Sequence, residues 1–123
     1  MQNLEQIRAR NALAFSKMPL SGQQGGDVIK NIPHQILNHG LLAVAAFGFA
    51  ERQEAVGKVF DAVASHLADP DVAIIPRDCT DRVTLMNFLT GNQATSETLK
   101  LATAEAMAWL SYAKRFVKTA KKG

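Results

Sequence analysis

The stretch Ser96–Gly123, SETLKLATAEAMAWLSYAKRFVKTAKKG, decides the fold of this chain. When successive residues are placed about 100° apart, as on an α-helix, its apolar side chains fall on one stripe. This stripe consists of Leu99, Ala102, Ala106, Trp109, Leu110, Ala113, Phe116, Val117 and Ala120. The opposite arc carries Lys100, Lys114, Arg115, Lys118, Lys121 and Lys122. The pattern predicts a long amphipathic helix whose apolar stripe packs in the core.

The end of this helix also holds the entire net positive charge. The chain has 14 Lys and Arg against 11 Asp and Glu, which gives a formal net charge of +3. Residues 114–123 contain five of these cations and no acid, so the other residues carry a net charge of −2. Such a concentrated positive field suits an anionic partner such as nucleic acid. The alternative is an ordinary solvated helix end, where lysines interact favourably with the helix dipole.

The preceding sequence predicts further helices that are separated by turn residues. Their approximate spans are 3–18, 27–40, 41–54, 53–67 and 81–91. Asn3 is the expected N-cap of the first helix, and Thr80 or Asp81 is expected to cap the helix that ends at Gly91. In the second span, Pro33 is expected to break the helix or to open a new one.

The remaining segments fit one helical domain. Asp27 is expected to cap the second helix after the glycine-rich connector 21–26. Residues 41–54 are apolar nearly all round, which predicts the buried centre of the domain. Residues 72–76 are apolar but have no partner strand, so they are expected to form a packed loop. We therefore predict an all-α fold, a single compact bundle of five to seven helices over residues 1–123.

The first helix is apolar on more than one side. Its main stripe consists of Leu4, Ile7, Ala14, Phe15 and Met18. Ala9 and Ala12 lie off that stripe, so a second surface of the helix is also apolar. This small-residue side is a candidate interface with another protein.

Composition places the chain among globular proteins. A hydrophobic fraction of 47% and a charged fraction of 20% favour a folded domain over disorder. Cys79 is the single cysteine, which excludes an internal disulfide and fits a reducing cytoplasm. The residues after Met1 do not resemble a signal peptide, and the longest apolar run, 41–50, is too short to span a bilayer. We therefore expect a cytoplasmic protein with no membrane partner.

No group of residues has the spacing of a catalytic or metal site. His34 and His39 are five residues apart, which is not the spacing of a helical zinc site, and Cys79 has no CxxC companion. The acids in 69–81 occupy turn and cap positions and lack the spacing of an EF-hand. We expect the histidines, His66 included, to lie at the surface or at helix ends. A binding or assembly subunit with no metal and no cofactor is therefore favoured over an enzyme.

Three segments, taken in order, resemble one known family. They are Leu4-Glu5-Gln6-x-Arg8-Ala9-x-x-Ala12, then Ile32-Pro33-x-x-Ile36 with Gly40-Leu41 and Ala45-Ala46-Phe47, and last Thr103-x-Glu105-Ala106-x-x-Trp109-Leu110-x-x-Ala113-Lys114-Arg115-Phe116. Over nearly the whole chain they are similar to the small helical subunit of the type III-B, Cmr-type CRISPR effector complex. One departure is His39 directly before Gly40, where the family commonly has asparagine.

The resemblance implies a cytoplasmic all-α subunit without catalysis of its own in an RNA-guided antiviral complex. Its partners would be the other Cmr effector subunits, copies of itself stacked as a minor filament, and the guide RNA and target RNA. Such a subunit contacts the RNA backbone through clustered cations. The candidate residues for contact with RNA or with the complex are Lys114, Arg115, Lys118 and Lys121, then Arg8, Arg10, Lys17 and Lys30. Arg8 has a second interpretation, a structural ion pair with a carboxylate such as Glu105.

Two alternative classes have sequence features that can be checked. The first is a free-standing small helical nucleic-acid-binding or adaptor protein, but no compact helix-turn-helix with polar base-reading residues is visible. The second is a helical-bundle enzyme with a carboxylate-bridged metal site, which requires a Glu-x-x-His motif that the sequence lacks. The family resemblance favours the effector subunit over both.

Overall fold

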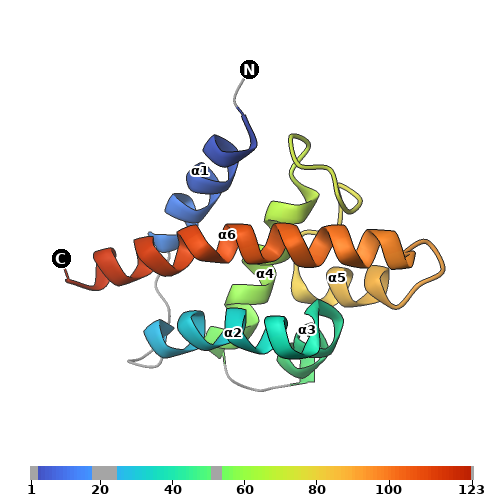
Figure 1. Ribbon diagram of the computed structural model, residues 1–123, viewed down its shortest axis with the longest axis horizontal. Coiled ribbons are helices and arrows are strands. Elements are labelled where there is room, and N and C mark those ends of the chain that lie inside the picture. Colours follow the sequence, from blue (N-terminus) through green and yellow to red (C-terminus); the bar gives the residue numbers. More distant parts are fainter. Residues whose placement is uncertain (1–2, 18–24, 51–53, 123) are drawn as a thin grey trace.

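The computed structural model describes residues 3–17, 25–50 and 54–122, and within these ranges it contains helices and loops but no strand. The helices are α1 (Leu4–Ser16), α2 (Gly25–His39), α3 (Leu41–Ala50), α4 (Glu54–Ala68), α5 (Arg82–Leu89) and α6 (Ser96–Lys122) (Figure 1). The all-α prediction is therefore confirmed. Residues 72–76 form a loop that buries Ile75, as expected for an apolar segment without a partner strand.

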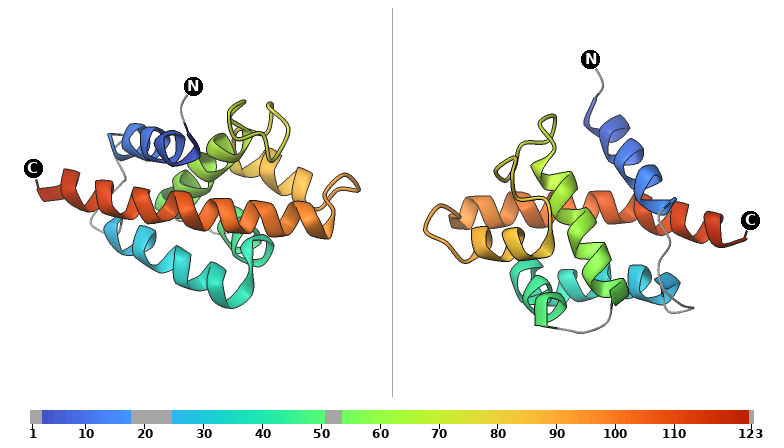
Figure 2. Two further views of the ribbon diagram at one scale, coloured as in Figure 1. Left: turned by 45° about the horizontal axis from the view of Figure 1, so that its top comes forward. Right: turned by 180° about the vertical axis from the view of Figure 1, so that it is seen from behind.

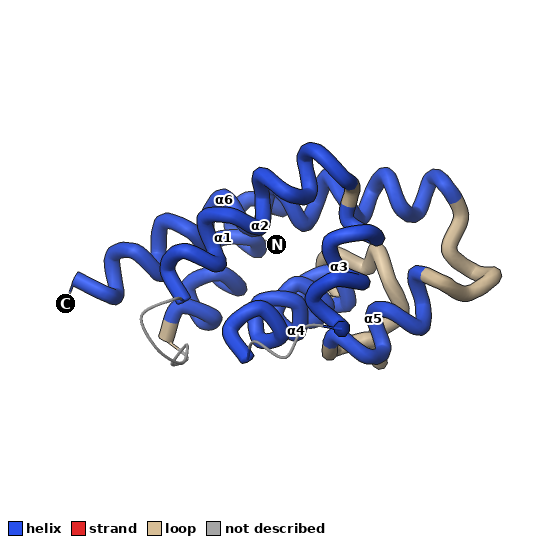
Figure 3. Tube along the Cα trace, turned by 90° about the horizontal axis from the view of Figure 1, so that it is seen from below, coloured by secondary structure: helices blue, strands red, loops and turns tan. Residues whose placement is uncertain are grey.

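Helix α6 runs along the whole molecule and contacts α1, α2, α3 and α4 (Figure 1). α1 packs obliquely against its middle and C-terminal part, and α2 runs antiparallel beside it (Figures 1 and 2). Seen from below, α1, α2 and α6 form one layer and α3, α4 and α5 form a second (Figure 3). The apolar stripe of α6 thus faces the second layer and supplies one wall of the core.

The predicted stripe of α6 is confirmed residue by residue. Its fully buried members are Ala102, Ala106, Trp109, Leu110 and Ala113, each no more than 1% exposed. Leu99, Phe116 and Val117 are partly buried at the two ends of the stripe. The side chain of Ala120 lies outside the described part of the structure.

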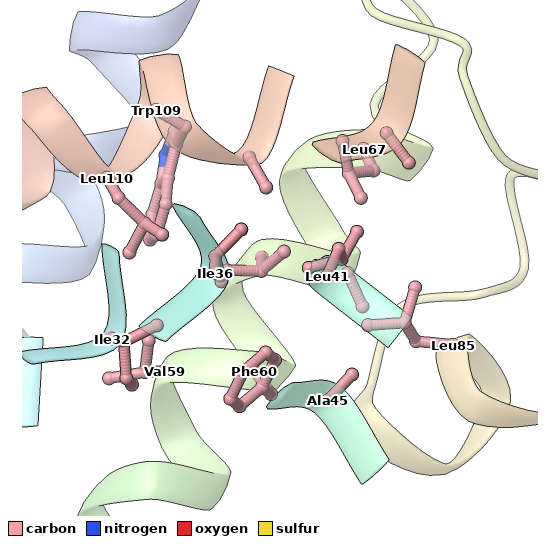
Figure 4. Close-up of a cluster of buried hydrophobic side chains, with 14 of the residues drawn as sticks. Ile32, Ile36, Leu41, Ala45, Val59, Phe60, Leu67, Leu85, Trp109 and Leu110 are labelled. Carbon is pink, nitrogen blue, oxygen red and sulfur yellow. The ribbon is translucent and has the colours of Figure 1, made fainter. Parts of the chain in front are cut away.

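The centre of the core is α4 rather than the helix predicted at 41–54. Val59, Phe60 and Leu67 of α4 are completely buried (Figure 4). In α3, by contrast, Ala43 and Ala46 are exposed. α4 contacts α1, α2, α3, α5 and α6, whereas the contacts of α3 are with α2, α4, α5 and α6. Within residues 41–46, whose side chains the structure describes, the uniformly apolar sequence thus includes exposed alanines and does not mark the centre of the core.

Short-range hydrogen bonds fix the helix ends. Asn3 forms a capping box with Gln6, with both side chain to backbone distances at 2.9 Å, as the sequence predicted for the start of α1. Asp81, not Thr80, caps α5. α6 begins at Ser96, as expected, and Thr95 directly before it caps the helix, since its hydroxyl accepts the Thr98 N–H at 3.1 Å.

Helix α2 is continuous through Pro33, which corrects the predicted break. Pro33 lacks an N–H for the Ile29 carbonyl, and an interior proline costs a helix about 3 kcal/mol. Ile29, Ile32 and Ile36 are all buried on both sides of it, and each such side chain contributes about 1.5–3 kcal/mol. Tertiary packing therefore outweighs the proline. The expected cap Asp27 lies inside the helix, which begins at Gly25.

Helix α2 ends as predicted at Gly40. Gly40 has a φ of +86°, and its N–H donates to the Ile36 carbonyl at 2.7 Å. A residue with a Cβ is strained in this conformation. The glycine thus turns the chain sharply from α2 into α3. The connector 21–24, Met18 and the junction 51–53 lie outside the described residues.

Candidate nucleic-acid interface

Cations gather at one end of the molecule, where the C-terminal part of α6, the end of α1 and the first turns of α2 lie together (Figures 1 and 2). Lys114 and Arg115 on α6, Lys17 at the C-cap of α1 and Lys30 on α2 are all exposed. We call these four residues the basic end. Lys118 and Lys121 belong to the same part of α6, but their side chains lie outside the described residues. The fold thus brings Lys17 and Lys30 near the cationic end of α6, which their sequence positions do not show.

A polar cluster joins α1 to α4 and α6 on the side of α6 that faces the core. Its members are Arg8, Arg10, Asn11, His66, Asp69 and Glu105. Arg8 donates two hydrogen bonds to Glu105, from Nε to Oε2 at 2.7 Å and from Nη2 to Oε1 at 2.8 Å. Oε2 of Glu105 also lies 2.9 Å from Nε2 of His66. One buried carboxylate therefore holds α1 and α4 against α6.

Asn11 bridges the remaining part of the cluster. Its side-chain nitrogen, Nδ2, lies 2.9 Å from Nδ1 of His66 and 3.0 Å from Oδ2 of Asp69, and it donates to both. Asp69 also accepts from Nη2 of Arg10 at 3.1 Å. Because Asn11 donates to Nδ1, the proton of a neutral His66 ring resides on Nε2 and is donated to Glu105. Each polar atom named here has a specific partner.

Burial and hydrogen bonding set the charge of the two central groups. Burial alone would raise the pKa of Glu105, but hydrogen bonds from Arg8 and His66 outweigh it and hold the pKa below its usual value. Burial dominates at His66 and lowers the pKa of the imidazole despite the attraction of Glu105. At neutral pH, Glu105 is therefore ionised and the His66 ring is neutral.

Asp69 is ionised for similar reasons. Burial would raise its pKa, but hydrogen bonds from the Asp71 amide and from Asn11, together with the charge of Arg10, lower it. The Asp71 amide donates to Oδ1 of Asp69 at 2.8 Å, which closes the turn after α4. Asp69 thus has the turn role that its sequence position predicted, and it also anchors α1.

The cations that were predicted to contact RNA or the complex differ in their surroundings. Arg8 pairs with Glu105, so its second interpretation as a structural ion pair is confirmed. Arg10 is engaged with Asp69, although its side chain is 45% exposed. Contact of Lys114, Arg115, Lys17 and Lys30 with RNA or with the complex stays a prediction, and their exposure is consistent with it.

His66 lies at a helix end, as expected, but it is not at the surface. His34 and His39 are exposed as expected, but the His66 side chain is only 1% exposed. It sits in the last turn of α4, three residues after Val63 and seven after Val59, both of which are buried. This spacing puts His66 on the inward face of the helix. The signal was therefore present in the sequence, whereas its partners Asn11 and Glu105 come from distant segments.

The predicted protein interface at Ala12 is wrong. Ala12 is 0% exposed and lies within the core of this chain, and Ala9 is partly buried. On the predicted main stripe, Leu4 and Ala14 are exposed instead. The reason is that α1 turns the face containing Arg8, Ala12 and Phe15 towards α6 and α4, so a small residue is needed where the helices approach closely.

Replacing Ala12 by leucine is expected to destabilise the isolated chain by about 1–3 kcal/mol, because three extra carbon atoms must enter a filled space. Urea denaturation followed by circular dichroism measures the change. Ala14→Leu on the exposed side of the same helix is the matched control, with an expected change within about 0.5 kcal/mol. Equal stability of the two variants would show that Ala12 does not lie in the core.

A groove of about 340 Å³ separates α1 from α4 beside the cluster. Asn11 and Phe15 of α1, Lys58 and Ser65 of α4, and Trp109 are among its lining residues. Within residues 3–17, 25–50 and 54–122, no three His, Cys, Asp or Glu side chains converge as metal ligands. Cys79 is buried in its loop, and burial raises the pKa of its thiol. Among the described helices, none has both the length and the hydrophobicity to cross a bilayer.

A family model described as CRISPR-associated protein (Cas_Cmr5) matches residues 4–120, which is almost the whole chain. A search of curated protein sequences and a search of solved structures found no match.

Proposed function

Because the chain belongs to the Cas_Cmr5 family, the small subunits of type III-B CRISPR complexes, we propose that its copies stack as a minor filament along the duplex of guide RNA and target RNA. The family implies association with the other Cmr subunits. In the proposal, the chain contributes no catalytic group and acts in antiviral defence by helping to hold the RNA duplex in the cytoplasmic effector complex.

The basic end is the observation that supports contact with RNA. Lys17, Lys30, Lys114 and Arg115 are exposed and lie on three helices at one end of the molecule. Clustered cations contact phosphates without reading bases, which is sufficient in a complex where base pairing with the guide RNA reads the sequence. The basic end is therefore suited to follow an RNA backbone whatever its sequence.

Repetition compensates for a weak individual contact. A few exposed cations in one copy provide a modest and salt-sensitive attraction. When several copies are held along one duplex, each further contact forms at a high effective concentration. We therefore expect weak RNA binding by the isolated chain and strong dependence on the basic end in the assembled complex.

Reversing the charge of Lys114, Arg115 and Lys118 together is expected to leave the isolated fold intact and to lower target-RNA capture by the assembled complex by about tenfold or more, because the loss is repeated in each copy. The dependence of log affinity on log salt concentration should also become shallower, by about 0.7–0.9 for each lost phosphate contact per copy. Filter binding of labelled target RNA over a salt series measures both quantities.

A charge-matched control separates location from net charge. The double variant Lys114→Glu/Arg115→Glu is compared with Arg77→Glu/Lys100→Glu, which changes the net charge equally at exposed positions away from the basic end. Only the first double variant should lower RNA capture. Full capture by the triple variant in a correctly assembled complex would reject the basic end as the RNA-contacting surface.

A further inference from the structure

His66 is a titratable side chain enclosed by three parts of the chain. Its ring is 1% exposed and stacks on Trp109 of α6, with ring centroids 5.9 Å apart. The charged groups that face it are Glu105 from α6, Asp69 directly after α4 and Arg8 from α1. A proton taken up by His66 therefore cannot be solvated by water without a rearrangement of the cluster.

The hydrogen bonds fit a neutral ring and not a charged one. In the neutral ring, Nε2–H donates to Glu105 and Nδ1 accepts from Asn11. A second proton on Nδ1 would point at the Asn11 N–H group, so two donors would face each other at 2.9 Å. Rotating the Asn11 amide would place its oxygen against Oδ2 of Asp69, where two acceptors would repel.

The neighbouring carboxylates do not remove this conflict. Glu105 attracts a charged ring, but both of its oxygens already accept hydrogen bonds from Arg8. Asp69 attracts it as well, but it is paired with Arg10 at 3.1 Å. Protonated His66 would therefore be attracted by two carboxylates whose charges are already offset by Arg8 and Arg10. It would also lose the hydrogen bond from Asn11.

We propose that His66 is a proton-operated latch for α1. While the ring is neutral, Asn11 ties α1 to α4 and to the turn at Asp69 across the groove. When the ring gains a proton, the hydrogen bond from Asn11 is lost. α1 then separates from α4 more often, while its contact with α6 through Arg8 and Glu105 is kept. The inference is independent of the proposed function in RNA binding.

The direction of the pH dependence follows from linkage. The pKa of His66 is lower in the folded chain than its ordinary value of about 6.5, so the unfolded chain binds the proton more readily. The latch is therefore fully closed above about pH 6.5 and weakens as the pH falls towards the folded pKa. Glu105 and Asp69 have lowered pKa values, so their contributions are lost only below about pH 4 to 4.5. The interval between these limits isolates His66.

The test uses the intact chain in two measurements. Long-range ¹H–¹⁵N spectra should show His66 with its proton on Nε2 at neutral pH, which requires no substitution. Hydrogen exchange, corrected for the intrinsic effect of pH, should show that protection of residues 4–16 falls by about threefold or more between about pH 7.5 and pH 5.5. Protection of α5, which does not touch the cluster, should not change.

His66→Gln is the informative variant because glutamine can donate to Glu105 but cannot take up a proton in this range. It should abolish the pH effect on residues 4–16. His34→Gln is the matched control, since it removes an exposed histidine that lies 3.2 Å from Nδ2 of Asn38 and is not part of the cluster, and it should behave as the unmodified chain. Loss of protection in His66→Gln equal to that of the unmodified chain would overturn the proposal.

The proposal stays falsifiable if His66→Gln does not fold. In the unmodified chain, three results would each overturn it: a neutral tautomer protonated on Nδ1, a His66 pKa at or above 6.5, or unchanged protection of α1 at the two pH values. The expected tautomer together with pH-dependent protection confined to the α1 side would support it.

Discussion

Glu105→Ala is expected to lower the free energy of unfolding by about 3–5 kcal/mol, the usual cost of removing one partner of a buried ion pair. The carboxylate is 5% exposed and accepts from Arg8 and from Nε2 of His66. Its removal leaves a guanidinium that is only 22% exposed and a buried imidazole N–H without their acceptor. Because single domains of this size are stable by about 5–15 kcal/mol, the change is a large part of the total.

Two comparisons make the Glu105 prediction specific. Glu97→Ala removes an exposed acid from the first turn of the same helix and should cost at most about 1 kcal/mol. The double variant Arg8→Met/Glu105→Leu should recover part of the stability lost in Glu105→Ala, because it leaves no buried charge without a partner. Urea denaturation followed by circular dichroism provides all three values. A cost below about 1 kcal/mol for Glu105→Ala would mean that the cluster does not hold the helices together.

The second large effect is expected at Trp109, and Trp109→Ala should destabilise the chain by about 3–5 kcal/mol. The side chain is 1% exposed and contacts Phe15 and His66 with ring centroid distances of 5.4 and 5.9 Å. Alanine would leave a cavity where α1, α4 and α6 meet. The thermal midpoint of a domain of this size should fall by about 3–5 °C for each kcal/mol.

Trp109→Phe separates the loss of packing from the loss of a polar group. The indole N–H has no hydrogen-bond partner among the described residues, so phenylalanine removes no such bond. It also keeps an aromatic ring beside Phe15, and the expected cost is therefore about 1–2 kcal/mol. If the two substitutions destabilise the chain equally, the ring itself is not what fills the core.

Most of the secondary structure could be predicted because its causes are local. The apolar stripe of α6 depends on a repeat of about 3.6 residues, and its members are buried as expected. The cap at Asn3, the turn at Gly40 and the cap at Asp81 each depend on residues within four positions. The family resemblance rested on such helical segments, and the match over residues 4–120 confirmed it.

Predictions failed where packing between distant helices competes with a local preference. Pro33 lies inside α2 because the buried isoleucines around it outweigh the lost hydrogen bond. The segment 41–50 is uniformly apolar, but α4 is more central because it contacts each of the other five described helices, α1 included. Ala12 is buried within the chain and not at a protein interface as predicted. The sequence of α1 alone does not determine which side of the helix packs against α6.

The candidate site divides in the same way. By itself, the sequence determined that the positive charge lies at the end of the last helix, because charge and helical periodicity are both properties of that segment. Only the tertiary structure placed Lys17 and Lys30 at the same end, and only it joined Asn11, His66 and Glu105 across separations of 55 and 39 residues. Such contacts depend on which helix faces meet after the chain has folded, and no local spacing encodes that choice.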